Sequence, residues 1–179
     1  MPVRIIAGKW RGHTIAAPPG SRTRPTTDRV REAWLSALQL DLPGSRVLDL
    51  FAGSGALGLE ALSRGAASAT FVERANGALR ALSANVHKLG VDDVAHVVRG
   101  DALKYAARLE PLAFDIALAD PPYGVGAAEG LAELFRAVPF AAQLWIEHRA
   151  GEPLPALPGM HTRKYGDTAL AFIPAPEER

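Results

Sequence analysis

From Arg46 onward the sequence alternates short apolar runs with longer runs that are apolar on one side only, and this alternation constrains the fold most. The short runs have the length of buried strands, and the longer runs have the spacing of helices. We predict strands at 47–51, 69–73, 94–99, 114–119 and 143–148, and helices at 56–64, 75–89, 102–109 and 127–137. Because strands that alternate with helices build a mostly parallel sheet with helices on both faces, the sequence predicts an α/β fold.

The two ends of the chain follow another pattern, that of antiparallel strand pairs. Residues 3–15 predict a short β-hairpin, because two apolar stretches flank a pair of glycines. Residues 160–165 and 168–173 predict a second antiparallel pair, joined by a Gly-Asp turn. The predicted sheet is therefore parallel in its body and antiparallel at its C-terminal edge.

Between the first hairpin and the repeated units we expect one helix. It is predicted to start at a cap on Thr27 or Asp28 and to run to about Leu40. We treat 1–45 as an extension of a single domain whose main part is 46–179. Up to Arg46 the chain holds eight Lys and Arg but three Asp and Glu, whereas the remainder is mildly acidic. This asymmetry suits either a polyanionic partner or a solvated basic surface.

Composition excludes several classes of protein. The 179 residues suffice for one domain with its own core. Cysteine is absent, which excludes disulfides and thiolate chemistry, and the five His show no ligand spacing, so no metal site is predicted. No apolar run is long enough to span a bilayer, and the first residues lack the apolar centre of a signal peptide. We expect a cytoplasmic protein, most simply a monomer.

A glycine-rich turn follows the first predicted strand of the main part. Gly53, Gly55 and Gly58 match the pattern G-x-G-x-x-G, in which glycines let the backbone turn sharply and approach a ligand. The pattern permits NAD, FAD or S-adenosylmethionine, and glycines also serve packing alone. Glu73 ends the second predicted strand, where a carboxylate can accept the hydrogens of ribose hydroxyls. Asp101 ends the third, where it can accept from an adenine amino group or cap a helix.

The sequence Asp120-Pro121-Pro122-Tyr123 follows the fourth strand of this main part and indicates the chemistry. The prolines remove two donors and stiffen the backbone, so that the Asp120 side chain and the Pro121 carbonyl present two acceptors. Two acceptors hold an aromatic amino group with its nitrogen aimed at a methyl donor, and Tyr123 offers a ring on which an extruded base can stack. We predict direct methyl transfer to an amino nitrogen, without a metal.

The motifs leave the target base open, and three hypotheses remain beside methylation of another amino group. An adenine-N6 methyltransferase acting on DNA or RNA would use the same chemistry. An NAD-dependent oxidoreductase would use the glycine pattern but leave Asp120–Tyr123 unexplained. A non-catalytic RNA-binding assembly factor could retain the fold without the reaction.

The sequence resembles the bacterial ribosomal RNA small subunit guanine-N2 methyltransferase D family. The resemblance covers nearly the whole chain and is carried by 4–12 (RIIAGKWRG), 24–32 (RPTTDRVRE), 49–66 with FAGSG at its centre, 120–123 (DPPY) and 164–168 (KYGDT). The first two blocks are more restrictive than the glycine and DPPY motifs, which many amino-methyltransferases share. The resemblance implies a Rossmann-like class I methyltransferase with a seven-stranded sheet.

The resemblance also implies the cofactor, the target and the residues that serve them. The target would be one guanine of 16S ribosomal RNA, within the small subunit or a partly assembled one. The residues expected to bind S-adenosylmethionine are Asp49, Phe51, Ala52, Gly53, Ser54, Gly55, Glu73, Asp101, Ala102 and Asp120. The residues expected to act on the base are Asp120, Pro121, Pro122 and Tyr123. Those expected to contact RNA are Arg4, Lys9, Trp10, Arg11, Arg22, Arg24, Arg29 and Arg31, although Trp10 is as well suited to packing the hairpin onto the core.

Overall fold

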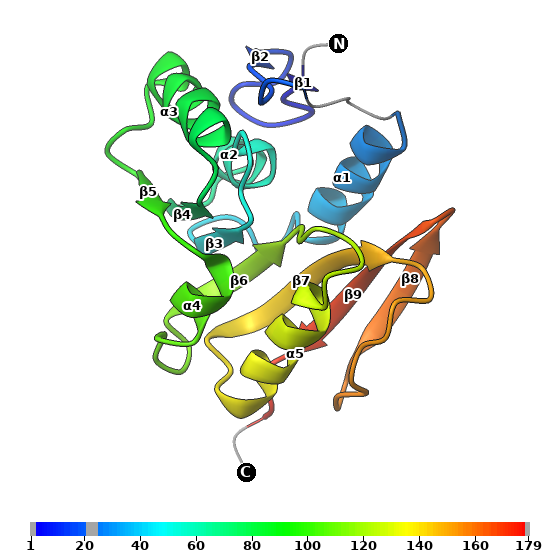
Figure 1. Ribbon diagram of the computed structural model, residues 1–179. Helices are drawn as coiled ribbons and strands as arrows, with labels where there is room; N and C mark the ends of the chain where they lie inside the picture. Colours follow the sequence, from blue (N-terminus) through cyan, green and yellow to red (C-terminus); the bar gives the residue numbers. More distant parts are fainter. Residues whose placement is uncertain (1–2, 21–24, 178–179) are drawn as a thin grey trace.

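A seven-stranded sheet runs through the protein in the order β5-β4-β3-β6-β7-β9-β8 (Figure 1). The computed structural model describes residues 3–20 and 25–177, with the backbone alone at 25–27. The strands are β3 (Arg46–Leu50), β4 (Ser68–Glu73), β5 (Ala95–Arg99), β6 (Phe114–Ala119), β7 (Ala141–Arg149), β8 (His161–Tyr165) and β9 (Thr168–Pro174). β3 to β7 are parallel, and β9 pairs antiparallel with both β7 and β8.

The order of the strands places a switch point between β3 and β6. The chain first builds outward from β3 through β4 to β5, then crosses back to lay β6 and β7 on the other side of β3. Connections that leave adjacent parallel strands in opposite directions open a crevice at the carboxyl ends of those strands. The candidate motifs at the ends of β3 and β6 therefore meet at one place.

Helices cover both faces of the sheet (Figure 1). They are α1 (Pro25–Ala37), α2 (Ala56–Ser63), α3 (Asn76–Leu89), α4 (Ala102–Ala106) and α5 (Ala127–Ala137). The first three lie with the N-terminal hairpin over one face, and the last two lie over the other. Among the described helices, none is long and apolar enough to cross a membrane.

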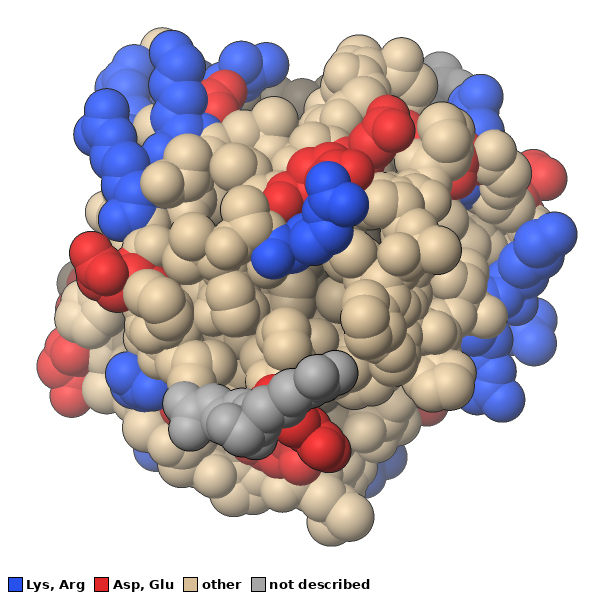
Figure 2. All heavy atoms as spheres, turned by 90° about the horizontal axis from the view of Figure 1, so that it is seen from below, with Lys and Arg blue, Asp and Glu red and all other residues tan. Residues whose placement is uncertain are grey.

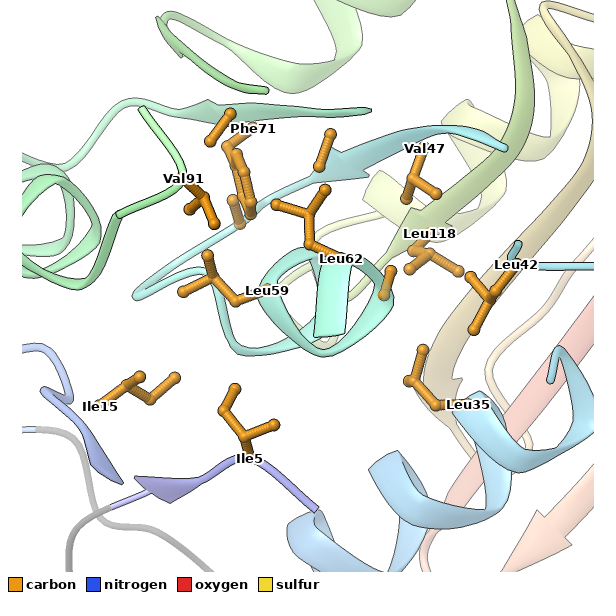
Figure 3. Close-up of a cluster of buried hydrophobic side chains, with 14 of the residues drawn as sticks. Ile5, Ile15, Leu35, Leu42, Val47, Leu59, Leu62, Phe71, Val91 and Leu118 are labelled. Carbon is orange, nitrogen blue, oxygen red and sulfur yellow. The ribbon is translucent and has the colours of Figure 1, made fainter. Parts of the chain in front are cut away.

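The core on the α1–α3 face forms around α2 (Figure 3). Leu59 and Leu62 of this helix lie between Phe71 of the sheet and Ile5 and Ile15 of the hairpin. All five side chains are buried, so α2 is covered on one side by the sheet and on the other by the hairpin. Their burial from water provides the main force that holds hairpin, helix and sheet together.

Buried polar groups attach the N-terminal hairpin, β1 (Val3–Arg4) and β2 (Thr14–Ile15), to the helices beneath it. The Glu60 carboxylate of α2 accepts hydrogen bonds from two backbone N–H groups of the hairpin, and Asn85 of α3 exchanges two with Ala16. Gly8, at a φ of +86°, lies so close to α2 that a Cβ there would be 1.9 Å from the Ser63 carbonyl oxygen. The hairpin is therefore fitted closely to α2 and α3.

The predicted alternation of strands and helices is confirmed, as are both antiparallel pairs and the end of α3 at Gly90. The predicted cap of the first helix is wrong, because α1 begins at Pro25 and ends at Ala37, not near Leu40. A proline suits the first turn of a helix, where its missing N–H would have no partner. The fourth helix is also shorter than predicted, since α4 ends at Ala106 and the chain turns before Pro111.

Candidate active site

Two pockets meet at the carboxyl ends of β3 and β6. The wide pocket, about 570 Å³, is lined by Phe51, Glu73, Asp101, Ala102 and the segment 120–123, among others. The narrow pocket, about 230 Å³, is lined by Ala52, Gly53, Ser54, Asp28, Arg31 and Glu147, among others. Phe51 and Asp120 line both pockets, so a group bound in one would lie beside a group bound in the other.

The carboxylates of the wide pocket are held by backbone N–H groups. Glu73 accepts from Gly53 at 2.8 Å and from Arg74 and Ala75 at 2.9 Å. Asp101 caps α4 by accepting from the Lys104 N–H at 2.9 Å, which confirms the capping role predicted for it. A carboxylate has about four acceptor sites, so both side chains retain capacity for a ligand.

The three glycines of the turn serve different purposes. A Cβ at Gly55 or Gly58 would lie 2.5 Å or less from Leu82 or Phe71, so these two glycines let α2 pack closely on its neighbours. Gly53, at a φ of +58°, has nothing within 4 Å of a Cβ and faces open space. Gly53 is therefore the position at which the turn leaves room for a ligand.

The wide pocket fits S-adenosylmethionine on these observations. Its volume lies within the roughly 300–1,000 Å³ range of ligand pockets. Glu73 would accept from the ribose hydroxyls and Asp101 from the adenine amino group. Gly53 lines the adjoining narrow pocket, where its open side would admit the end of the molecule that passes the shared residues Phe51 and Asp120. Ala102 is part of the wall, as predicted.

Hydrogen bonds of Asp49 and Ser54 stabilise the glycine-rich turn. Asp49 is 1% exposed and accepts from the Gly58 N–H at 2.9 Å, and it lines neither pocket. Burial holds its pKa well above the ordinary value, and the charges of Asp120 and Glu73 raise it further against the opposing Gly58 hydrogen bond. The Ser54 carbonyl accepts from buried Asn85. For Asp49 the structure indicates support of the turn, and direct contact with a cofactor remains a prediction.

Asp120, directly after β6, lies beside Glu147 of β7, because Ala119 pairs with Ile146 one position earlier in these adjacent parallel strands. Asp120 is exposed to the two pockets, yet the surrounding protein removes its carboxyl group from bulk water and raises its pKa to about 6. Glu147 is 8% exposed, and burial together with the charge of Asp120 raises its pKa to about 8.

Tyr123 connects the tetrapeptide to Glu147. Its hydroxyl donates to Glu147 Oε1 at 3.3 Å and lies 3.0 Å from Thr168 Oγ1. The Arg149 guanidinium lies 5.6 Å from the centroid of its ring and covers one face. The stacking of a base on the ring remains a prediction. Glu147 was not among the predicted site residues, although an acid directly after the apolar run Leu144-Trp145-Ile146 is a signal that could have identified it.

The residues predicted to contact RNA separate into four groups. Arg4, Lys9, Arg11 and Arg29 are exposed, and Arg22 and Arg24 lie outside the described residues. Trp10 is partly buried against the core, with the Lys9 ammonium 5.2 Å from its ring centroid. Arg31 is 6% exposed and donates to the Arg4 carbonyl at 2.8 Å, because its place on α1 turns it toward the narrow pocket. Burial lowers its pKa.

One end of the molecule carries charges of both signs. Figure 2 shows the face seen from below Figure 1, where Lys and Arg gather near the rim with Asp and Glu between them. Such a mixed surface is ordinary for a solvated face. The exposed basic residues of the N-terminal extension are thus the better candidates for contact with a polyanion.

Comparison with known proteins identifies the family of the chain. The sequence matches the family model described as "Conserved hypothetical protein 95" over residues 3–174. It is 38% identical over 162 residues to ribosomal RNA small subunit methyltransferase D of Escherichia coli K12, covering 87% of this chain and 79% of that protein. The solved structure of putative methyltransferase yhhF from Escherichia coli has a TM-score of 0.86 at 34% identity, over 99% of this chain and 100% of that one. A Thermus thermophilus 16S rRNA N2 methyltransferase (RsmC), solved with AdoMet and guanosine, shares the fold at a TM-score of 0.73 and 20% identity, over 98% of this chain and 50% of that one.

The fold and the site define a Rossmann-like methyltransferase that uses S-adenosylmethionine. More particularly, the chain belongs to the family of the ribosomal RNA small subunit methyltransferase D proteins. The predicted resemblance, fold class, enzyme class and cofactor are confirmed. The roles of individual residues remain predictions that rest on the geometry above.

Proposed function

We propose that the chain transfers the methyl group of S-adenosylmethionine to the exocyclic N2 amino group of one guanine in 16S ribosomal RNA. The observation that carries the proposal is Asp120, which directly follows β6, lines both pockets and is followed by Pro121-Pro122-Tyr123. The name of the Escherichia coli relative supports the small subunit as target, and that of the Thermus thermophilus protein supports N2 of 16S rRNA.

S-adenosylmethionine, when bound, supplies a methyl group on a positively charged sulfur that keeps the electron pair of the broken carbon–sulfur bond. The guanine amino nitrogen is a weak nucleophile, because its lone pair is delocalised into the ring. The Asp120 carboxylate and the Pro121 carbonyl would accept its two hydrogens, which opposes the delocalisation and orients the nitrogen. When the nitrogen–carbon bond forms, the nitrogen must lose a proton. We assign that proton to Asp120, because a pKa of about 6 makes it a better base than an ordinary carboxylate.

The proposed partner is 16S rRNA within the small subunit or an assembly intermediate, bound by a monomer in the cytoplasm. Exposed Arg4, Lys9, Arg11 and Arg29 would neutralise phosphates beside the site. The extension 1–45 and the main part 46–179 would then act as one unit, since the hairpin is attached to α2 and α3.

The test is transfer of labelled methyl groups to small ribosomal subunits isolated from cells that lack the protein, followed by nucleoside analysis. We expect label in N2-methylguanosine at a single position. Label in N6-methyladenosine would retain the mechanism and refute the target. Absence of label despite cofactor binding would favour the assembly-factor reading.

A further inference from the structure

Two acidic side chains, Asp120 and Glu147, stand next to each other in the wall of the narrow pocket. Asp120 and Glu147 occupy matching positions on adjacent parallel strands, which lie about 4.8 Å apart. Both side chains line the narrow pocket, so they point to the same face of the sheet. Like charges this close repel each other unless a ligand supplies donors or positive charge between them. The pair therefore suits a ligand that presents two donors side by side.

One of the two carboxyl oxygens of Glu147 is fixed by a hydrogen bond, which orients the side chain. Oε1 accepts from the Tyr123 hydroxyl, which in turn contacts Thr168. Oε2 has no hydrogen-bond partner among the residues that the structure describes. A carboxylate with one oxygen anchored and the other free is oriented to accept one further hydrogen bond.

Guanine and adenine differ at the edge that carries the amino group. In guanine the N2 amino group is adjacent to N1–H, so the edge presents two donors in a row. In adenine the N6 amino group is adjacent to an N1 lone pair, which a carboxylate would repel. Enzymes that extrude a base read this edge by hydrogen bonds. Two neighbouring carboxylates thus match guanine and oppose adenine.

We infer that Glu147 selects guanine by accepting the N1–H with its free oxygen, while Asp120 accepts from the N2 amino group. The inference rests on the proposed function, since it assigns the recognition of that same base. It also gives a physical reason why guanine would be preferred to adenine. The glycine turn and the tetrapeptide do not distinguish the two bases.

The test compares guanine with 2-aminopurine, which keeps the 2-amino group but has a lone pair at N1. Small subunits are reconstituted with rRNA carrying either base at the methylated position. Above about pH 8, where Glu147 is ionised, the wild-type protein should prefer guanine by about tenfold to a hundredfold, as expected for a hydrogen bond to a charged group. In Glu147→Gln the side-chain amide can donate to N1 of 2-aminopurine, so the preference should fall about tenfold or more.

A second measurement reads the same preference without methyl transfer. Binding of both substrates is titrated with S-adenosylhomocysteine present, using 2-aminopurine fluorescence for one and competition for the other. The ratio of affinities should shift in Glu147→Gln as the ratio of rates does. Glu152→Gln removes a nearby carboxylate that bonds to the Gly124 N–H and should keep the wild-type ratio. Tyr123→Phe, which removes the donor to Oε1, should lower the preference by less.

The outcomes separate the inference from the proposed function. If the wild-type protein forms no N2-methylguanosine, the proposed function fails. If it methylates guanine but Glu147→Gln and Tyr123→Phe leave both ratios unchanged, the proposed function stands and the role of Glu147 is refuted.

Discussion

The wide and narrow pockets share Phe51 and Asp120 but differ in how many hydrogen-bond donors their acidic side chains have. In the wide pocket Glu73 accepts hydrogen bonds from three backbone N–H groups, and Asp101 caps a helix. Both carboxylates are therefore held in place before a ligand binds. In the narrow pocket Glu147 is nearly buried with one donor, the Tyr123 hydroxyl, and lies beside Asp120.

We expect this difference between a pocket that is formed before its ligand binds and one that is completed by the proposed substrate. Backbone N–H groups fix the wide pocket through the fold itself, as suits a cofactor that every target requires. The carboxyl groups of the narrow pocket have raised pKa values because too few donors compensate their loss of water. A guanine edge would supply the missing donors, so recognition of the base and stabilisation of charge coincide.

The largest expected effect is that of Asp120→Asn, which tests the side chain shared by both pockets. The amide keeps the shape of the carboxylate but loses the acceptor for the proton, so methyl transfer should fall about 10²- to 10⁴-fold. Cofactor affinity by calorimetry should stay within about threefold, since Glu73 and Asp101 remain. Asp115→Asn, on the same strand beside Arg46, is the matched control and should transfer methyl normally. Near-normal transfer by Asp120→Asn would contradict the assigned role.

The second prediction concerns stability and isolates the narrow pocket. The pKa of Glu147 is about 8 when folded, above its ordinary value, so the folded state binds more protons and stability falls as pH rises. The free energy of unfolding should drop by about 2–4 kcal/mol between about pH 5 and about pH 9 from this group. The other ionisable groups that line or border the same pocket are Asp120, Tyr123, and Asp28 and Arg31 of α1.

Denaturant unfolding across this pH range measures the drop, and Glu147→Gln should remove most of it while raising stability at high pH. Glu152→Gln serves as the control that should keep the slope. An unchanged slope in Glu147→Gln would mean that the carboxyl group is not desolvated as the geometry indicates.

Much of the wide pocket could be predicted from the sequence, and little of the narrow one. Phe51, Glu73 and Asp101 follow three strands that are separated by regular helix lengths, so their common position follows from alternation alone. Glu147 meets Asp120 only through the pairing of β6 with β7, which no local pattern encodes. Arg31 was expected on the surface because charge suggested it, yet its helical position beside Val30 and Trp34 buries it.

The third prediction applies the same substitution to the wide pocket. In Glu73→Gln one oxygen becomes an NH₂ group that cannot accept from the backbone N–H groups it faces. Cofactor affinity should fall about 10- to 100-fold, the effect of losing hydrogen bonds to a charged group. The preference for guanine over 2-aminopurine should not change, in contrast to Glu147→Gln. A change in that preference would show that the two pockets are not separate in function.

The smallest expected effect is at Gly53, the glycine of the turn that faces open space. An alanine at its φ of +58° meets no neighbouring atom, so the cost to stability should be the strain of the left-handed backbone alone, about 1–2 kcal/mol. Gly90 ends α3 at a φ of +66° with equally open surroundings, and Gly90→Ala should cost the same amount. Only Gly53→Ala should also weaken S-adenosylmethionine binding, because its methyl group would occupy the space left for the ligand. Equal cofactor affinity in the two variants, measured by calorimetry, would show that the turn is shaped for folding and not for the ligand.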